Sequence, residues 1–309
     1  MFTNLILKFM NKSNALIEEK MASYPYQESP LIEQIFDLSY SDGVKAHLLD
    51  IYRPINKTGL QPTIIDIHGG GWYSCYKETN KHFCMELADR GFTVVSINYS
   101  LSPNATMKTQ IREIFEFFYW LELNAKKYSI DLNKLFICGD SAGGQLASLA
   151  LLTIGDNRRQ DFFGVKTNLK FMGACFIGGA FDVKGLAKLP MTGVYFNPIL
   201  GKGYRRDRII DEVDFFNATP LDYPPTLLIS SKEDFMRKHS DKAEAHLKKQ
   251  GIECTKYIWE KSTIPKRKLS HVFNVLYPTW EESITTNSMI ADFFKKICRE
   301  KEKLENSED

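Results

Sequence analysis

A glycine-framed serine between a strand and a helix constrains the fold of this 309-residue chain most strongly. The pentapeptide Gly139-Asp140-Ser141-Ala142-Gly143 follows the apolar run 135–138 and precedes a helix-like stretch at 145–154. In that setting, G-x-S-x-G places the serine on a strained turn, with its hydroxyl exposed above a sheet. The glycines let strand and helix approach where a Cβ would clash. The pattern predicts a nucleophile at Ser141 and locates the site at that end of the sheet.

A second glycine motif lies upstream, at the end of another apolar run. Residues 63–67 predict a buried strand, which continues into His68-Gly69-Gly70-Gly71-Trp72. An H-G-G-G segment upstream of a G-x-S-x-G turn is typical of an oxyanion hole. We therefore expect the N–H groups of Gly70, Gly71 and Ala142 to stabilise a developing oxyanion. A plain strand-to-loop turn is the alternative reading of this glycine motif.

The general base is expected downstream, because the order in such sites is serine, acid, histidine. His239 and His246 lie seven residues apart in a lysine-rich helical pattern over 236–250, which favours solvent-facing positions. His271 lies in a loop after a strand-like run, where a base reaches the serine. We predict His271 as the base, with a surface loop histidine as the alternative.

Two carboxylates compete for the role of the acid. The strand-like run 225–230 leads into Ser231-Lys232-Glu233-Asp234. Either Asp234 or Glu233 would accept the Nδ1–H of the imidazole and stabilise the imidazolium. Local chemistry does not separate the two, and a solvated turn carboxylate is the alternative for both.

These segments together resemble the α/β-hydrolase superfamily, specifically bacterial esterases related to hormone-sensitive lipase and to acetyl- and feruloyl-esterase-like carboxylesterases. The resemblance rests on segments 68–72, 98–103 and 128–144 and on the Asp234/His271 pair, and it spans roughly 35–294. In that family the acid is an aspartate directly after the seventh strand, which favours Asp234 over Glu233. The resemblance implies a Ser141–His271–Asp234 triad that needs no cofactor and hydrolyses small, short-chain acyl esters.

Strands and helices alternate along most of the chain, which implies a mostly parallel sheet with helices on both faces. With the resemblance, this predicts an α/β-hydrolase fold with an eight-stranded sheet in a single domain over 1–309. An antiparallel hairpin joined by Ser41-Asp42-Gly43 is expected first. The predicted strands are 34–40, 47–53, 63–67, 92–97, 134–138, 171–177, 226–230 and 255–259, and the helices include 109–128 and 282–298.

Residues 178–225 interrupt this alternation and exceed what a plain crossover needs. We expect a cap insertion over the site, in which Tyr195 and Phe196 line a substrate pocket or simply pack. His68, Trp72 and Asp140 are further pocket candidates. An N-terminal cap or lid is expected within 1–30, where Phe2, Leu5, Ile6, Phe9 and Met10 share one helical face. Membrane contact is the alternative for that face, and the charged tail 299–309 is expected to be flexible.

Composition argues against several other classes. Forty basic and 38 acidic residues give a net charge of +2, which disfavours a nucleic-acid partner. Six cysteines without a C-x-x-C motif suit a reducing compartment, so we expect a cytoplasmic protein. Metal-ligand spacings and phosphate-binding glycine loops do not occur in the sequence. No apolar run approaches ~18 residues, so stable membrane insertion is not expected. The aromatic helix at 114–120 is expected to fill the core, with a homodimer contact as the alternative.

Three functional alternatives remain open. An amide hydrolase or peptidase, formamidase-like or dipeptidyl-peptidase-like, would use the same triad. A non-catalytic ligand-binding protein on a hydrolase scaffold is the second. A membrane-associated lipase that binds lipid through the face of residues 2–10 is the third.

Overall fold

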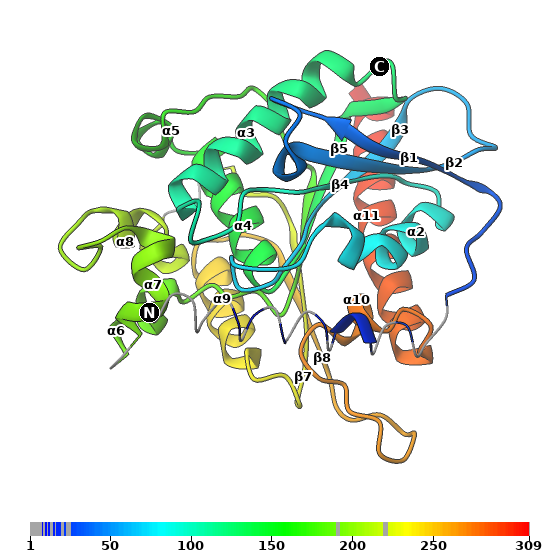
Figure 1. Ribbon diagram of the computed structural model, residues 1–309. Coiled ribbons are helices and arrows are strands. Elements are labelled where there is room, and N and C mark those ends of the chain that lie inside the picture. The colour runs from blue at the N-terminus through cyan, green and yellow to red at the C-terminus, as the bar shows by residue number, and fades with distance from the viewer. Residues whose placement is uncertain are drawn as a thin grey trace.

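A computed structural model gives the structure of the protein and describes residues 8, 10, 12, 15, 17–19, 22, 26–189, 192–218 and 222–308. In this part of the chain eight strands form one sheet in the order β1-β2-β4-β3-β5-β6-β7-β8 (Figure 1). β2 pairs antiparallel with β1 and β4, and all the other pairs are parallel. The strands are β1 (Ile32–Ser39), β2 (Leu48–Pro54), β3 (Gln61–Ile67), β4 (Thr93–Ile97), β5 (Ile130–Asp140), β6 (Gly173–Ile177), β7 (Thr226–Ser231) and β8 (Cys254–Trp259).

Helices cover both faces of the sheet, as Figure 1 shows. On one face lie α3 (Met107–Asn124), α4 (Ala142–Ile154), α5 (Asn157–Phe163) and α9 (Arg237–Lys249). On the other face lie α2 (Lys81–Asp89), α10 (Phe273–Leu276) and α11 (Glu281–Glu308). The predicted fold, a mostly parallel eight-stranded sheet between helical layers, is confirmed.

The core divides between these two faces because side chains alternate along each strand. On β3, Ile65 and Ile67 pack with the α3 and α4 side, whereas Ile64 packs with Phe83 of α2 and Phe294 of α11. A parallel strand buried on both faces is apolar at nearly every position. That is why residues 63–67 are recognisable in the sequence as a buried strand.

Two predicted boundaries are wrong. The β1–β2 connection is longer than the expected turn at 41–43, and it includes the 3-10 helix η1 (Lys45–His47). The C-terminal helix does not end at residue 298 but continues to Glu308. Lys301 pairs with Glu305 one turn later at 3.9 Å, and Glu302 pairs with Lys134 of β5 at 2.6 Å. Such pairs support a helix that is otherwise charged; the flexibility of the tail stays a prediction.

Residues 178–225, called the insertion from here on, form short helices beside the sheet. The described elements are α6 (Val183–Lys188), α7 (Gly193–Leu200), α8 (Ile209–Glu212) and the 3-10 helix η3 (Phe215–Asn217). In Figure 1, α6, α7 and α8 lie together at one side of the molecule. The insertion therefore contributes no strand in its described part.

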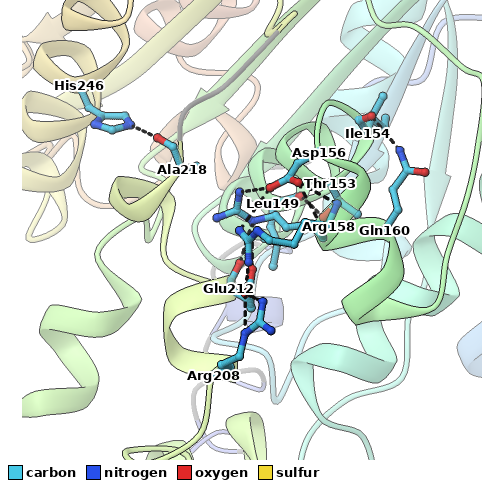
Figure 2. Close-up of polar contacts among 11 residues, drawn as sticks. Leu149, Thr153, Ile154, Asp156, Arg158, Gln160, Arg208, Glu212, Ala218 and His246 are labelled. Atoms are coloured by element: carbon cyan, nitrogen blue, oxygen red, sulfur yellow. Dashed lines mark hydrogen bonds and ion pairs between the residues drawn. The ribbon is translucent and has the colours of Figure 1, made fainter.

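A charged cluster around the buried Glu212 and Arg159 fastens the insertion to α5 (Figure 2). The carboxylate of Glu212, at the end of α8, contacts the guanidinium groups of Arg158 and of Arg208, the latter at 2.8 Å. Arg159, whose side chain is only 2% exposed, donates from Nε to the Glu212 carbonyl at 3.3 Å and from Nη1 to Asp156 at 3.0 Å. The charges of Glu212 and Arg159 are buried and need partners, so the cluster ties α8 to α5.

The N-terminal expectations fall mostly outside the described residues. Phe2, Leu5, Ile6 and Phe9 are among the residues not described, whereas Met10 is helical and packs against the core. The Met10 methyl lies 3.5 Å from the position that a Cβ on Gly71 would take. No helix in the described ranges combines the length and the apolar character that crossing a bilayer requires.

Candidate active site

Ser141 occupies the sharp turn that its motif predicts. It lies between β5 and α4 with φ +50° and ψ −117°, a conformation that a residue with a Cβ rarely adopts. A Cβ on Gly143 would lie 2.0 Å from the Ile67 carbonyl oxygen, and a Cβ on Gly139 would lie 2.6 Å from the Gly143 carbonyl. Glycine is thus required at both positions, as expected. The Ser141 N–H is held by the Ile177 carbonyl at 2.8 Å.

Three side chains distant in sequence meet at this turn. The Ser141 Oγ lies 2.8 Å from His271 Nε2, and His271 Nδ1 lies 2.8 Å from Asp234 Oδ1. Ser141 follows β5, Asp234 follows β7, and His271 lies in the loop after β8. These strands are parallel, so their carboxyl ends share one edge of the sheet. The structure thus brings together the three residues predicted as nucleophile, base and acid.

Asp234, and not Glu233, contacts the imidazole. Its carboxylate also accepts hydrogen bonds from the Ser230 hydroxyl at 3.0 Å and the Met236 N–H at 2.8 Å. Burial raises the pKa of Asp234, but the hydrogen bond from His271 and these donors outweigh burial and hold it below its ordinary value. Glu233 instead accepts the Leu269 N–H at 2.8 Å, two residues before His271. Glu233 therefore supports the loop that carries the base.

Gly178 is a site residue that sequence reasoning missed. A Cβ there would lie 2.9 Å from both Asp234 Oδ2 and His271 Cε1, and the residue has φ +57°. The Asp234–His271 pair therefore fits only against a glycine. The available signal was the pair Gly178-Gly179 directly after a predicted strand.

The prediction that His239 and His246 face solvent is wrong. His239 accepts the Asp182 N–H at Nδ1, at 3.1 Å, and burial lowers its pKa. His246 donates from Nε2 to the Ala218 carbonyl at 3.1 Å (Figure 2). Both partners belong to the insertion, which packs onto the face of α9 that carries these two histidines.

In the loop after β3, the hydrogen bonds of two carbonyls set the directions of the N–H groups of Gly70 and Gly71. The Gly69 carbonyl faces the His68 Nδ1 at 2.8 Å, and the Gly70 carbonyl accepts the Ser74 hydroxyl at 2.8 Å. In a trans peptide the next N–H points the opposite way, so these bonds set the directions of the Gly70 and Gly71 N–H groups. In the described part of the chain neither amide donates a hydrogen bond.

The amide of Ala142 is the third predicted donor. Ala142 is the first residue of α4, so its N–H has no partner within the helix. The helix dipole adds a partial positive charge at the same place. The three amides predicted to bind an oxyanion are therefore available to a bound group.

A buried pair of carboxyl groups lies behind the glycine loop, and sequence reasoning missed this arrangement. Asp140 Oδ1 accepts the Gly69 N–H and the Asn80 side-chain amide, both at 2.9 Å. Asn80 also donates to Asp66, at 3.1 and 3.2 Å. Burial and the charge of Asp140 raise the pKa of Asp66 to about 7, and burial raises that of Asp140. Near pH 7 the Asp66 carboxyl therefore retains a proton for part of the time.

The five predicted pocket residues differ in burial. Four are buried, and Tyr195 is partly buried. The His68 ring stacks on Tyr99 with centroids 4.4 Å apart, and burial lowers its pKa to about 4. The Trp72 Nε1–H donates to Gln145 Oε1 at 3.1 Å. Phe196 packs near the Trp72 ring, Asp140 holds the glycine loop, and Tyr195 reaches the Gly71 carbonyl.

One exposed aromatic residue was not predicted at the site. Phe235 directly follows Asp234, is 78% exposed, and its ring centroid lies 4.5 Å from that of His271. Among the described residues there is no group of three or more His, Cys, Asp or Glu side chains arranged as metal ligands. A hydroxyl bonded to an imidazole, an orienting carboxylate and outward amides together suit nucleophilic acyl transfer.

Comparisons with known proteins agree with this geometry. The chain is 31% identical over 208 residues to the probable carboxylic ester hydrolase LipM of Mycobacterium tuberculosis, which covers 64% of this chain and 47% of that protein. It is 26% identical over 201 residues to the kynurenine formamidase of Salmo salar, covering 65% of this chain and 60% of that protein. The chain thus spans about half the length of LipM.

A solved structure matches over nearly the whole chain. Esterase B from Lactobacillus rhamnosis superimposes with a TM-score of 0.89 and 26% identity, covering 98% of each chain. Another structure of esterase B is described as inhibited by a tributyrin phosphonate. The BD-FAE family model matches residues 49–241, which span β3, the serine turn and Asp234. Because this match exceeds half of the sequence, the chain belongs to the BD-FAE family.

Proposed function

We propose that the protein is a serine carboxylesterase that hydrolyses small, short-chain acyl esters. Ser141, His271 and Asp234 form the triad, and the amides of Gly70, Gly71 and Ala142 form the oxyanion hole. The observation that carries the proposal is the unbroken chain of 2.8 Å contacts from the Ser141 hydroxyl through His271 to Asp234. The ester-hydrolase and esterase names of the relatives support the same reaction class.

In the first half of the reaction Ser141 Oγ attacks the ester carbonyl carbon while His271 Nε2 takes the hydroxyl proton. Asp234 accepts the Nδ1–H, which fixes the tautomer and stabilises the imidazolium. The carbonyl oxygen becomes an oxyanion, and the three amides stabilise it because they are oriented before the reaction begins.

The tetrahedral intermediate collapses when His271 gives its proton to the leaving alcohol oxygen, which breaks the carbon–oxygen bond and leaves an acyl-serine. Water then attacks the acyl group while His271 takes its proton. The second collapse returns that proton to Ser141 Oγ and releases the acid. The direct contact of His271 Nε2 with Ser141 Oγ supports a single imidazole acting in both halves.

The insertion and the N-terminal segment act, in this proposal, as the cap. Tyr195 of α7 and Met10 both lie close to Gly71, one of the proposed oxyanion donors. A cap made of short helices between sheet strands sets how large an acyl group or alcohol fits. Cytoplasmic location and homodimer formation stay predictions.

An ester panel with Ser141→Ala as its control tests the proposal. We expect p-nitrophenyl acetate and butyrate to be hydrolysed faster than long-chain esters. Ser141→Ala lowers kcat by about 10,000-fold or more, as loss of a triad nucleophile does elsewhere. A fluorophosphonate probe is expected to label Ser141 in the folded protein. Equal turnover by wild type and Ser141→Ala would overturn the proposal, and unlabelled Ser141 would favour a ligand-binding protein.

An amide hydrolase is the second candidate, because the chain is similar to kynurenine formamidase over 65% of its length. The same triad cleaves amides when the leaving nitrogen is protonated. Parallel assays on p-nitrophenyl acetate and an N-formyl aryl amide separate the two candidates. A higher kcat/KM on the amide would replace the esterase assignment.

A further inference from the structure

The loop after β3 has an unusual backbone. Gly70, Gly71 and Trp72 have φ values of +103°, +61° and +67° in succession. The left-handed region costs a residue with a Cβ about 1–2 kcal/mol. Such a conformation persists only when neighbouring groups hold it. The groups that hold the carbonyls of this loop therefore decide where its N–H groups point.

Most of these carbonyls are held by the loop itself or by core elements. Three of the four carbonyls from residue 69 to residue 72 have partners of this kind. They are Gly69 O with His68 Nδ1 and the Tyr99 hydroxyl, Gly70 O with the Ser74 N–H and hydroxyl, and Trp72 O with the Ser102 N–H and Gln110 Nε2. These anchors do not depend on the insertion.

The Gly71 carbonyl has its partner in the insertion. The Tyr195 hydroxyl of α7 donates to it at 2.8 Å, across 124 residues of sequence. Tyr195 is held in turn, because the Tyr73 hydroxyl donates to its carbonyl at 2.6 Å and the two rings lie 5.1 Å apart. A Cβ on Gly71 would lie 2.6 Å from the Tyr195 hydroxyl, so glycine is also needed for this approach.

We infer that Tyr195 is a positioning residue for the oxyanion hole, through which the insertion controls the reactivity of the site. The inference rests on the proposed function. The Tyr195 bond fixes the peptide between Gly71 and Trp72, which lies between two positive-φ residues. That peptide adjoins the one carrying the Gly71 N–H, whose direction the Ser74 contacts set. Loss of the Tyr195 bond frees the backbone on one side of Gly71, so its N–H is held less firmly toward the oxyanion.

The position of α7 therefore matters beyond shaping a pocket. Phe196, the next residue, has its ring centroid 6.2 Å from that of Trp72, so α7 contacts the loop at Trp72 as well as at the Gly71 carbonyl. A displacement of α7 would break the Tyr195 hydrogen bond and at the same time loosen the loop. The oxyanion hole is thus competent only when α7 is in this position.

Tyr195→Phe, compared with Tyr204→Phe, tests this role. The Tyr204 hydroxyl also donates to a backbone carbonyl, that of Ala187 at 2.9 Å, but entirely within the insertion. We expect Tyr195→Phe to lower kcat on p-nitrophenyl butyrate by about 10-fold, less than loss of an oxyanion donor itself. KM and Tm should stay close to wild type, because the ring and its packing remain. Tyr204→Phe should keep wild-type kcat.

Amide hydrogen exchange supplies a readout that does not depend on activity. In Tyr195→Phe we expect faster exchange in a peptide covering residues 69–75, with the rest of the chain unchanged. Unchanged kcat and exchange in an active wild-type background would overturn the inference. So would a lower Tm with a raised KM and normal kcat, which indicates a structural role only. Absence of Ser141-dependent turnover in wild type would instead overturn the proposed function, and exchange would still decide the Tyr195 contact.

Discussion

The proposed triad and the glycine loop of the proposed oxyanion hole are held by different parts of the molecule. Ser141, Asp234 and His271 follow three strands of one parallel array, so the ladders of β5, β6, β7 and β8 set their spacing. The loop of Gly70 and Gly71 follows β3 but is completed by Tyr195 of the insertion. The triad is thus built on strands, whereas the Gly71 carbonyl of the glycine loop depends on a short helix of the insertion.

This difference assigns separate roles to the two halves. Strand-borne groups are fixed by many backbone hydrogen bonds, so their geometry survives changes in the insertion. The glycine loop, with its run of positive φ values, retains its conformation only through hydrogen bonds from the groups packed around it. Variants on the two sides should therefore change different measured quantities.

The largest expected effect lies on the strand side, at Asp234. Asp234→Asn should lower kcat by about 10,000-fold, because a neutral amide no longer stabilises the imidazolium and its NH2 group, when it faces Nδ1, favours the wrong tautomer. Glu233→Gln should cost less than about 10-fold, since the amide oxygen still accepts the Leu269 N–H. Steady-state kinetics on one ester measures both. Equal losses in the two variants would contradict the assignment of the acid.

On the insertion side, Glu212→Gln should reduce stability strongly. It removes the carboxylate that faces Arg158 and Arg208 and lies near the buried Arg159. Loss of one partner from a buried ion cluster costs about 3 kcal/mol. Thermal unfolding measures the loss, with Glu302→Gln as the control. Glu302 forms a more exposed pair with Lys134, which is expected to contribute little.

Glu212→Gln also tests whether the insertion can loosen while the sheet stays folded. If Glu212→Gln lowers kcat at temperatures well below its Tm, the insertion has loosened before the sheet unfolds. Wild-type kcat at such temperatures, despite a lower Tm, would indicate that α8 and α7 do not move together.

A smaller effect concerns the buried carboxyl pair behind the loop. Asp66 has its pKa raised from 3.8 to about 7, first by burial and then by Asp140. The folded protein therefore keeps a proton that the unfolded chain releases near pH 4. Asp66 thus makes the protein less stable as pH rises from about 4 to about 7. Asp66→Asn lacks this penalty, so its Tm should gain on wild type between pH 4.5 and pH 8.5.

The gain should correspond to about 1–3 kcal/mol. Asp89→Asn, at an exposed aspartate on α2, is the matched control and should show no such trend. Differential scanning at a series of pH values measures both variants. A constant Tm difference between Asp66→Asn and wild type across that range would show that Asp66 does not hold the raised pKa.

The strand-borne residues could be predicted from the sequence, whereas the contacts of the insertion could not. Residues 63–67 and 226–230 are mostly apolar because both faces are buried. The glycine motif and Asp234 follow these strands closely, so the local pattern located them. Asp234 was separated from Glu233 only by the family resemblance, since both follow the same strand. Asp234 contacts His271 Nδ1, whereas the neighbouring Glu233 accepts the Leu269 N–H. Adjacent side chains thus point to different partners, and the local sequence does not show which one faces the imidazole.

The supporting contacts had no local signal. Tyr195 meets Gly71 across 124 positions, and Asn80 meets Asp140 across 60. His239 and His246 looked exposed because the lysines of α9 mark one face, whereas the covering groups belong to the insertion. Contacts of this kind depend on how separate elements pack, which periodicity within one element does not encode.

A variant at Phe235 tests whether the insertion alone determines substrate selectivity, and we expect it to change activity least. Phe235 lies on the strand side, is 78% exposed, and has its ring against that of His271. His271 delivers the proton to the leaving oxygen in the proposed reaction, so the alcohol must pass beside this imidazole. An exposed phenyl group there offers apolar contact area to the alcohol and not to the acyl chain.

Phe235→Ala should therefore raise KM for phenyl butyrate by about 2- to 5-fold, a small apolar contribution to binding. KM for ethyl butyrate, with the same acyl group and a small alcohol, should stay near wild type, as should kcat for both esters. Phe36→Ala, at another exposed phenylalanine on β1, should change neither constant. Equal KM changes for the two butyrates would mean that Phe235 does not distinguish alcohols. The insertion would then carry selectivity on both sides of the ester bond.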